Sequence, residues 1–340
     1  MAALKDMRRS TRLTFLDQLP CGFFDCGARD LHRILVGPTL IELAGEREPP
    51  LFVSILLHGN EDSGLTAVQH VLKSLSLLPR SLMLLVGNVE AARQGQRRLD
   101  DQPDYNRIWP GAPNTCDTAE ACIMAEVHKR ALKRRAVAAI DLHNNTGRNP
   151  HYSVVCNLEP PTLKLAGLFS RRAVLFRGIP GTQTASFAGL IPAITAECGR
   201  PGEVANAEAA ARMVTAALSL DELSDAVSEK GPLDLYHTRG VVRIKADVDF
   251  DFGSGDAELR LDPAIDEHNF RDLEPGTELG QTSHPMPLQM IDETGRDVAE
   301  QYFVTSGGKL RLRTPAVPAM FTTDRRIVRQ DCLCYLMERL

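Results

Sequence analysis

Three side chains at the ends of predicted strands have the types that bind a catalytic metal ion. His58 and Glu61 follow the apolar run 51–57, and His143 follows the apolar run 137–142. Two imidazoles and one carboxylate match the ligand set of catalytic zinc, which keeps a fourth position for water. The pair His58-x-x-Glu61 is weak by itself, because chance produces about one such match here and a helix-capping turn also explains it. The combination of all three favours a metal site.

Two further acidic residues lie near the ends of predicted strands. Glu197 ends the apolar segment 194–197. A carboxylate there can take a proton from attacking water and pass it to a leaving amine, although an ion pair with Arg200 is the alternative. Asp141 lies two residues before His143, where it either orients the imidazole or caps a loop.

The loop 97–110 contains three arginines and the only tryptophan of the chain. Arginine binds carboxylates through two parallel hydrogen bonds, and an arginine directed at a carbonyl stabilises its developing oxyanion. Surface charge is the other interpretation of this loop.

The order of predicted elements indicates how these residues are positioned. Apolar runs predict strands at 37–43, 51–57, 81–87, 137–142, 153–157, 173–176 and 193–197, and helical periodicity predicts helices at 64–76, 119–135 and 205–220, with a polar loop at 88–118. Strands that alternate with helices are typical of an α/β fold with a mostly parallel or mixed, doubly wound sheet. In such sheets ligands bind at the carboxyl ends of strands, where the candidate residues occur.

The pattern changes near residue 230. From there to the C-terminus, short alternating runs are separated by Gly, Pro and Asp. We therefore expect a catalytic domain at 1–230 and a smaller β-rich domain at 231–340.

Composition narrows the classes of protein and partner. Hydrophobic residues make up 43% and charged residues 24% of 340 residues, with a net charge of −5, which is typical of a soluble globular protein. This balance gives no reason to expect nucleic acid or a membrane as partner, and no apolar run is long enough to span a membrane. The eight cysteines form no C-x-x-C pair, which favours reduced thiols in a cytoplasmic protein.

Four sequence motifs together carry a resemblance. They are HGNEDSG at 58–64, DYNRIWPG at 104–111, DLHNNTG at 141–147 and TAECGRPG at 195–202. In sequence and order they resemble the succinylglutamate desuccinylase/aspartoacylase family, within the zinc carboxypeptidase-like superfamily. The resemblance implies a sheet of the zinc carboxypeptidase type and a C-terminal β domain that covers the site.

The resemblance also implies roles for single residues. His58, Glu61 and His143 would bind one zinc ion per chain, and Glu197 would act as general base and then as general acid.

The substrate would be bound by other side chains. The resemblance implies that Asn106 and Arg107 bind its carboxylate and that an upstream arginine polarises the scissile carbonyl. Arg98 is the better match for this arginine, but the stretch before Asn106 is one residue longer than usual, so Arg97 stays open. Tyr302, in the second domain, is a further candidate for a substrate contact.

The expected function is therefore zinc-dependent hydrolysis of the amide bond of a small N-acyl amino acid or related carboxylate. The alternatives are a zinc carboxypeptidase or peptidoglycan-type peptidase, a non-catalytic zinc-binding module, and a metal-free protein in which the strand-end residues are only caps. The expected partner is a small carboxylate. The sequence does not fix the oligomeric state, and the resemblance adds a homodimer as one option.

Overall fold

The chain divides into two compact units that are interleaved in sequence. The computed structural model describes residues 12–113, 117–221, 232–253 and 255–340. Unit 1 comprises Met1–His143, Pro180–Thr195 and Ala207–Leu223, and unit 2 comprises Asn144–Ile179, Ala196–Asn206 and Ser224–Leu340. The predicted domain boundary near residue 230 falls in 222–231, outside the described residues, and stays a prediction.

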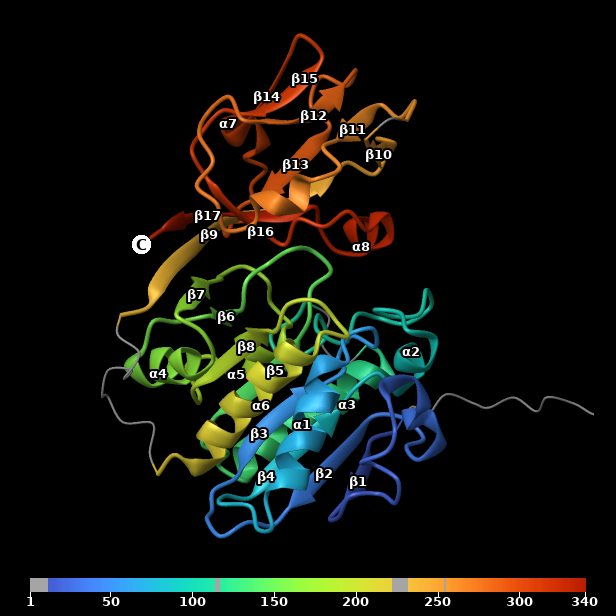
Figure 1. Cartoon of the computed structure of the whole chain (residues 1–340), viewed down its shortest axis with the longest axis vertical. Helices are drawn as coiled ribbons and strands as arrows, with labels where there is room; N and C mark the ends of the chain where they lie inside the picture. The colour runs from blue at the N-terminus through green and yellow to red at the C-terminus, as the bar shows by residue number, and fades with distance from the viewer. Residues whose placement is uncertain (1–11, 114–116, 222–231, 254) are drawn as a thin grey trace, which may run out of the picture. The chain divides into compact units, whose positions relative to one another are not determined.

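Unit 1 is built on a mixed sheet. Its strands, in spatial order, are β1 (Thr14–Leu16), β2 (Thr39–Leu43), β4 (Leu82–Val86), β3 (Leu51–Ile55) and β5 (Ala139–His143) (Figure 1). The strands β4, β3 and β5 are parallel, whereas β2 is antiparallel to β4. Every residue of β3, β4 and β5 is buried, as their continuous apolar runs predict.

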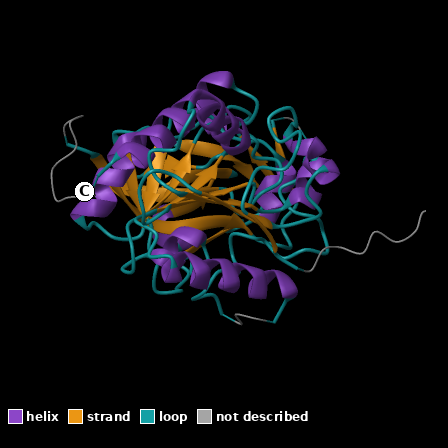
Figure 2. Cartoon of the chain, turned by 90° about the horizontal axis from the view of Figure 1, so that it is seen from below, coloured by secondary structure: helices purple, strands orange, loops and turns teal. Residues whose placement is uncertain are grey.

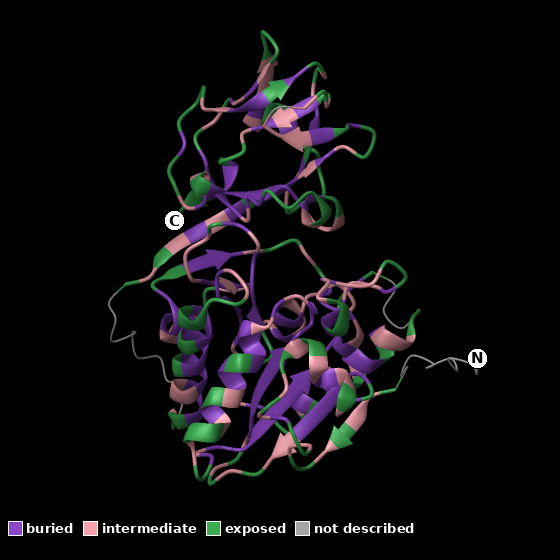
Figure 3. Cartoon of the chain, turned by 45° about the vertical axis from the view of Figure 1, so that its right-hand side comes forward, coloured by how far each residue is buried: buried purple, intermediate pink, exposed green. Residues whose placement is uncertain are grey.

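Helices flank these strands (Figure 2). Unit 1 contains η1 (Ala28–Arg33), α1 (Ser63–Ser74), α2 (Val89–Gln94), α3 (Ala119–Lys133) and α5 (Gln183–Phe187). Both β8 (Ala193–Glu197) and α6 (Val204–Ser219) contribute residues to the two units. The central strands β3, β4 and β5 are buried, whereas the helices alternate buried with exposed residues (Figure 3). This is the amphipathic pattern that predicted α1 and α3.

One element inside the predicted polar loop 88–118 is a helix, so that prediction was wrong there. Asn88 caps α2 by accepting a hydrogen bond from the Ala91 N–H through its side chain. The helix ends at Gly95, which has a φ of +63°. With only six residues, α2 is too short to show helical periodicity, and its cap and terminal glycine are the signals that indicate it.

Unit 2 contains further strands of the 12-stranded sheet. The strands β6 (Tyr152–Val155), β7 (Arg172–Leu175) and β9 (Asp234–Ile244) are parallel, and β17 (Cys334–Arg339), β16 (Val317–Ala319) and β13 (Leu288–Ile291) join them in antiparallel pairings. The helix α4 (Pro160–Phe169) connects β6 to β7. The sequence predicted the strands β6 and β7 but not α4.

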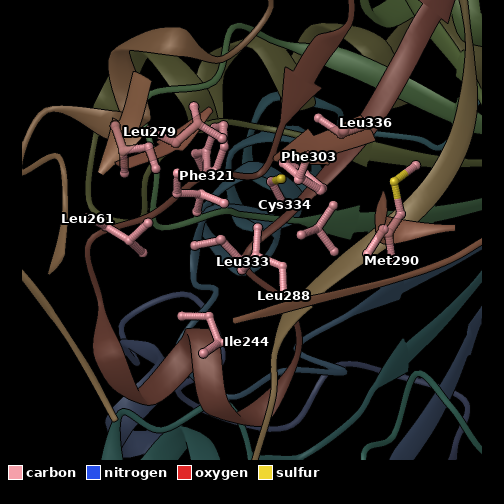
Figure 4. Packing of buried hydrophobic residues seen from close by; sticks show 14 of the residues in the cluster. Ile244, Leu261, Leu279, Leu288, Met290, Phe303, Phe321, Leu333, Cys334 and Leu336 are labelled. Carbon is pink, nitrogen blue, oxygen red and sulfur yellow. The ribbon is translucent and has the colours of Figure 1, made fainter. Parts of the chain in front are cut away.

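A smaller β-rich sheet lies in the C-terminal part of unit 2. It consists of β10 (Phe250–Phe252), β11 (Leu259–Leu261), β12 (Glu278–Thr282), β15 (Lys309–Leu312) and β14 (Phe303–Ser306), accompanied by η2 (Ile265–His268), α7 (Ala299–Tyr302) and α8 (Arg325–Gln330). Its side chains share one hydrophobic core with β9, β13 and β17, including Leu279, Phe303 and Leu336 (Figure 4). The expected α/β fold with a smaller C-terminal β-rich part is confirmed.

Two further observations bear on the chain's surroundings. None of the described helices is long and apolar enough to cross a membrane. The cysteines in the described residues, Cys116 not among them, are free thiols.

Candidate metal centre

The backbone at the end of β3 turns sharply to present the first candidate ligand. Leu56, two residues before His58, has a φ of +54°, a conformation that is rare outside glycine. Gly59 lies against α2 so closely that a Cβ atom there would be 2.1 Å from the Ala92 nitrogen. Glycine at position 59 is therefore required by packing, because any side chain there would push the loop away from α2.

Three buried side chains of unit 1 converge at this end of the sheet. The ligand atoms of His58, Glu61 and His143 all lie within 4.8 Å of one another. Glu61 lies between the imidazoles, with Oε1 2.8 Å from His58 Nδ1 and Oε2 2.7 Å from His143 Nδ1. Atoms bound to one tetrahedral zinc ion lie about 3.4 Å apart. The group therefore has the size and the donor types that fit one zinc ion.

Each imidazole is held from its other side by an aspartate. His58 Nε2 lies 3.0 Å from Asp104 Oδ1, and His143 Nε2 lies 2.6 Å from Asp141 Oδ2. A carboxylate only accepts hydrogen bonds, so each Nε2 carries a proton, and each Nδ1, which faces Glu61, is the nitrogen that a metal ion would take. Ser54 donates to Asp141 Oδ1 at 2.7 Å and fixes that carboxylate in turn.

The charges of this group favour a cation. Burial by itself raises the pKa of Glu61, but the charges of His58 and His143 outweigh it and hold that pKa below its ordinary range. Likewise, burial raises the pKa of Asp104, but Arg97 and His58 lower it to well below the usual value. Metal binding through Nδ1 would leave both imidazoles neutral, and Glu61, Asp104 and Asp141 together with Arg97 would then carry a formal charge of −2 (three negative charges and one positive). A divalent cation would balance that charge.

The structure separates the two arginines that the sequence left open. Arg97 is buried, bonds Asp104 Oδ2 through Nε and Nη2 at 3.3 and 3.0 Å, and has Nη1 3.9 Å from Glu61 Oε1. Arg98 instead donates to the backbone carbonyls of Leu99 and Gln102. Of the two arginines, Arg97 is thus the one beside the metal-binding group, whereas the bonds of Arg98 hold its own loop.

The predicted carboxylate-binding pair also lies in unit 1. Asn106 is buried, its Oδ1 accepts the Gln183 N–H at 2.8 Å, and its Nδ2 lies 3.2 Å from His143 Nε2. Arg107 is partly exposed and donates to the Asn106 carbonyl at 2.8 Å. Asn106 therefore anchors the start of α5, and Arg107 is the more accessible of the two.

The two remaining candidates belong to unit 2. Glu197 is the last residue of β8, is 8% exposed, and accepts a hydrogen bond from Asn145 at 3.3 Å. Tyr302 ends α7 and forms a side-chain hydrogen bond with Arg239. This bond gives the Tyr302 hydroxyl a structural partner within its own unit.

Comparison with known proteins identifies the family. The family model of the succinylglutamate desuccinylase/aspartoacylase catalytic domain matches residues 48–223, more than half of the chain. The chain belongs to this family. The matched range contains all four motifs that carry the resemblance, and the family's names describe enzymes that remove acyl groups by hydrolysis of an amide bond.

Solved structures of family members share the fold. Succinylglutamate desuccinylase from Chromobacterium violaceum is 17% identical, with 88% of each chain covered and a TM-score of 0.57. The Vibrio parahaemolyticus enzyme is 14% identical, with coverage of 88% of this chain and 86% of that one and a TM-score of 0.59. Murine aminoacylase 3 is 18% identical, with coverage of 87% and 97% and a TM-score of 0.53. No curated protein matches the sequence.

Two residues of the centre had no role assigned from the sequence. Asp104 begins the family motif at 104–111, but its contact with His58 spans 46 residues and no local spacing indicates it. Ser54 is a polar residue within a buried apolar strand. Because a buried hydroxyl needs a hydrogen-bond partner, that position was the available signal.

Proposed function

We propose that this protein is a zinc-dependent hydrolase that cleaves the amide bond of a small N-acyl amino acid or a related carboxylate. The observation that supports the proposal most is the orientation of the two imidazoles. His58 and His143 both turn Nδ1 toward Glu61 and are held at Nε2 by an aspartate. Capping residues need no such arrangement, whereas metal ligands do.

The chemistry that zinc supplies at such a site is Lewis acidity toward a water molecule and a carbonyl oxygen. His58, Glu61 and His143 would hold the ion, as their donor atoms fit it.

The chain's own residues would supply the proton transfers. Glu197 takes a proton from the attacking water while the water oxygen forms a bond to the carbonyl carbon. The carbon–nitrogen bond then breaks, and Glu197 returns the proton to the leaving nitrogen. The products are a carboxylic acid and a free amine. The buried position of Glu197 at a strand end supports this role.

Two arginines would orient and polarise the substrate. Arg107, with Asn106 beside it, binds the substrate carboxylate through a planar pair of hydrogen bonds. For the arginine near the scissile carbonyl we now favour Arg97 over Arg98, because Arg97 lies within 3.9 Å of Glu61. A fixed guanidinium there stabilises the charge that develops on the carbonyl oxygen.

The test is an amide-hydrolysis assay with a matched pair of variants. Release of free amine is measured with N-succinylglutamate, N-acetyl amino acids and short peptides for the wild type, Glu197→Gln and Glu208→Gln. We expect the wild type to hydrolyse the N-acyl amino acids. Glu197→Gln should lose at least about 100-fold in kcat and retain its zinc. Glu208→Gln should not change kcat, because Glu208 is an exposed acid on α6. Cleavage of peptides alone, or full activity of Glu197→Gln, would contradict the proposal.

A further inference from the structure

A chain of three side-chain amide contacts in unit 2 ends at the carboxylate of Glu197. Asn145 donates through Nδ2 to Glu197 Oε2 at 3.3 Å. Asn149 donates through Nδ2 to Asn145 Oδ1 at 3.0 Å. Asn149 Oδ1 accepts the backbone N–H of Met320 at 2.9 Å. The proposed general base is therefore linked to the segment that follows β16 by two asparagines.

The far end of the chain fixes the direction of every bond in it. The Met320 N–H can only donate, so the Asn149 amide must present its oxygen there and its nitrogen to Asn145. Asn145 consequently receives that bond on its oxygen and must direct its own nitrogen at Glu197. A flipped Asn145 amide would place two oxygens in contact, with no donor between them.

The loop that carries both asparagines is held in place independently. The Asn145 N–H donates to the Gly199 carbonyl at 3.0 Å. Thr146 donates to the Thr322 hydroxyl at 2.7 Å. At Gly147 a Cβ atom would come within 1.7 Å of the Phe321 carbonyl oxygen, so only glycine permits this approach. The loop 144–149 therefore has little freedom to move away from Glu197.

We propose that Asn145, oriented by Asn149, is a positioning residue that holds the carboxylate of Glu197 in the plane and rotamer needed for proton transfer. This inference rests on the proposed function, in which Glu197 is the base. Asn145 is 4% exposed, so its hydrogen bond is shielded from competition with water. A neutral amide suits this task, because it fixes one carboxylate oxygen without the full positive charge that would make a carboxylate a poor base.

The inference is tested with variants that break the chain at different links. Asn145→Ala removes the donor to Glu197. Asn149→Asp keeps an acceptor for the Met320 N–H but removes the donor that orients Asn145. Thr146→Val is the matched control, because it removes a hydrogen bond from the same loop without touching the amide chain.

We expect the loss of kcat to be larger for Asn145→Ala than for Asn149→Asp. On the N-acyl amino acid that the wild type hydrolyses, Asn145→Ala should lower kcat by about 10- to 100-fold, with KM within about threefold and zinc content unchanged. Asn149→Asp should show a smaller loss in the same direction. Loss of a donor to the ionised carboxylate should also move the acidic limb of kcat/KM upward by about half to one pH unit. Thr146→Val should behave as the wild type.

Two results would overturn the inference while leaving the proposed function intact. The first is a wild-type kcat together with an unmoved acidic limb of kcat/KM in Asn145→Ala. The second is a loss of kcat in Thr146→Val as large as that in Asn145→Ala, which would show a general effect of loop order. Full activity of Glu197→Gln would instead refute the proposed base. A crystal structure of Asn145→Ala gives a readout independent of turnover: we expect the Glu197 carboxylate to leave its present rotamer, and an unmoved carboxylate contradicts the inference.

Discussion

His58 and Asp104, which are 46 residues apart in the sequence, are joined by a contact of 3.0 Å between Nε2 and Oδ1. The same aspartate accepts hydrogen bonds from the Asn106 N–H and from Arg97. Asp104 therefore connects a proposed metal ligand, the proposed carboxylate-binding segment and the arginine beside Glu61. A change at this residue is expected to affect all three.

Replacement of Asp104 by alanine is expected to weaken zinc binding by about 10- to 100-fold, because His58 loses the partner that holds Nδ1 toward the metal. The measurement is a competition titration with a zinc chelator. The control is Asp101→Asn, an exposed acid in the same loop. Equal zinc affinity of the wild type and Asp104→Ala would show that Asp104 does not orient the ligand.

Substitutions of the neighbouring Arg97 and Arg98 should differ strongly in their effect on kcat/KM. We expect Arg97→Met to lower kcat/KM by at least about 100-fold, because it removes a guanidinium that stabilises charge in the transition state and leaves the partly buried Asp104 carboxylate without its cation. Arg98→Met should cost about fivefold or less, because the hydrogen bonds of Arg98 go to the loop carbonyls of Leu99 and Gln102. Steady-state kinetics of both variants decides the matter, and the reverse order would restore Arg98 as the polarising residue.

Packing at the metal-binding loop gives a prediction about stability. Gly59→Ala would place a Cβ atom 2.1 Å from the Ala92 nitrogen, and overpacking of this kind costs about 1–3 kcal/mol of unfolding free energy. Gly27→Ala is the matched control, because a Cβ atom at position 27 would have no neighbour within 4 Å among the described residues. Urea unfolding of both variants should show a lower midpoint only for Gly59→Ala. Equal midpoints would mean that the loop yields at little cost.

Cysteine reactivity offers a test that is independent of the metal. Burial raises the pKa of the Cys156 thiol to about 11. Because the thiolate is the reactive form, alkylation of Cys156 by iodoacetamide should be slow at pH 8 and should accelerate about tenfold per pH unit up to that pKa. Cys21 and Cys122 are exposed and serve as internal references in mass spectrometry. Labelling of Cys156 as fast as of Cys21 at pH 8 would refute this.

Much of the fold was predictable because its strands are buried on both sides. The continuous apolar runs placed β3, β4, β5 and β8 within two residues of their observed bounds. The spatial order was not predictable: β4 lies between β2 and β3, and strand neighbours depend on tertiary packing. Short elements such as α2 were missed because six residues carry little periodicity.

The candidate site, like the fold, was predictable only in part. His58, Glu61 and His143 could be grouped from sequence because the carboxyl ends of parallel strands share one edge of a sheet. The choice between Arg97 and Arg98 could not be made, because side chains in an irregular loop follow no period. Each side chain of such a loop points toward the residue that binds it. Arg97, for example, points toward Asp104, which accepts its hydrogen bond.

The central claim is that one zinc ion is held by the Nδ1 atoms of His58 and His143 and by the carboxylate of Glu61. The most direct measurement is the anomalous scattering at the zinc edge from crystals of protein purified without chelator. We predict a single peak about 2.1 Å from both Nδ1 atoms and within bonding distance of Glu61. Absence of such a peak, or a peak bonded to the Nε2 atoms instead, would contradict the account.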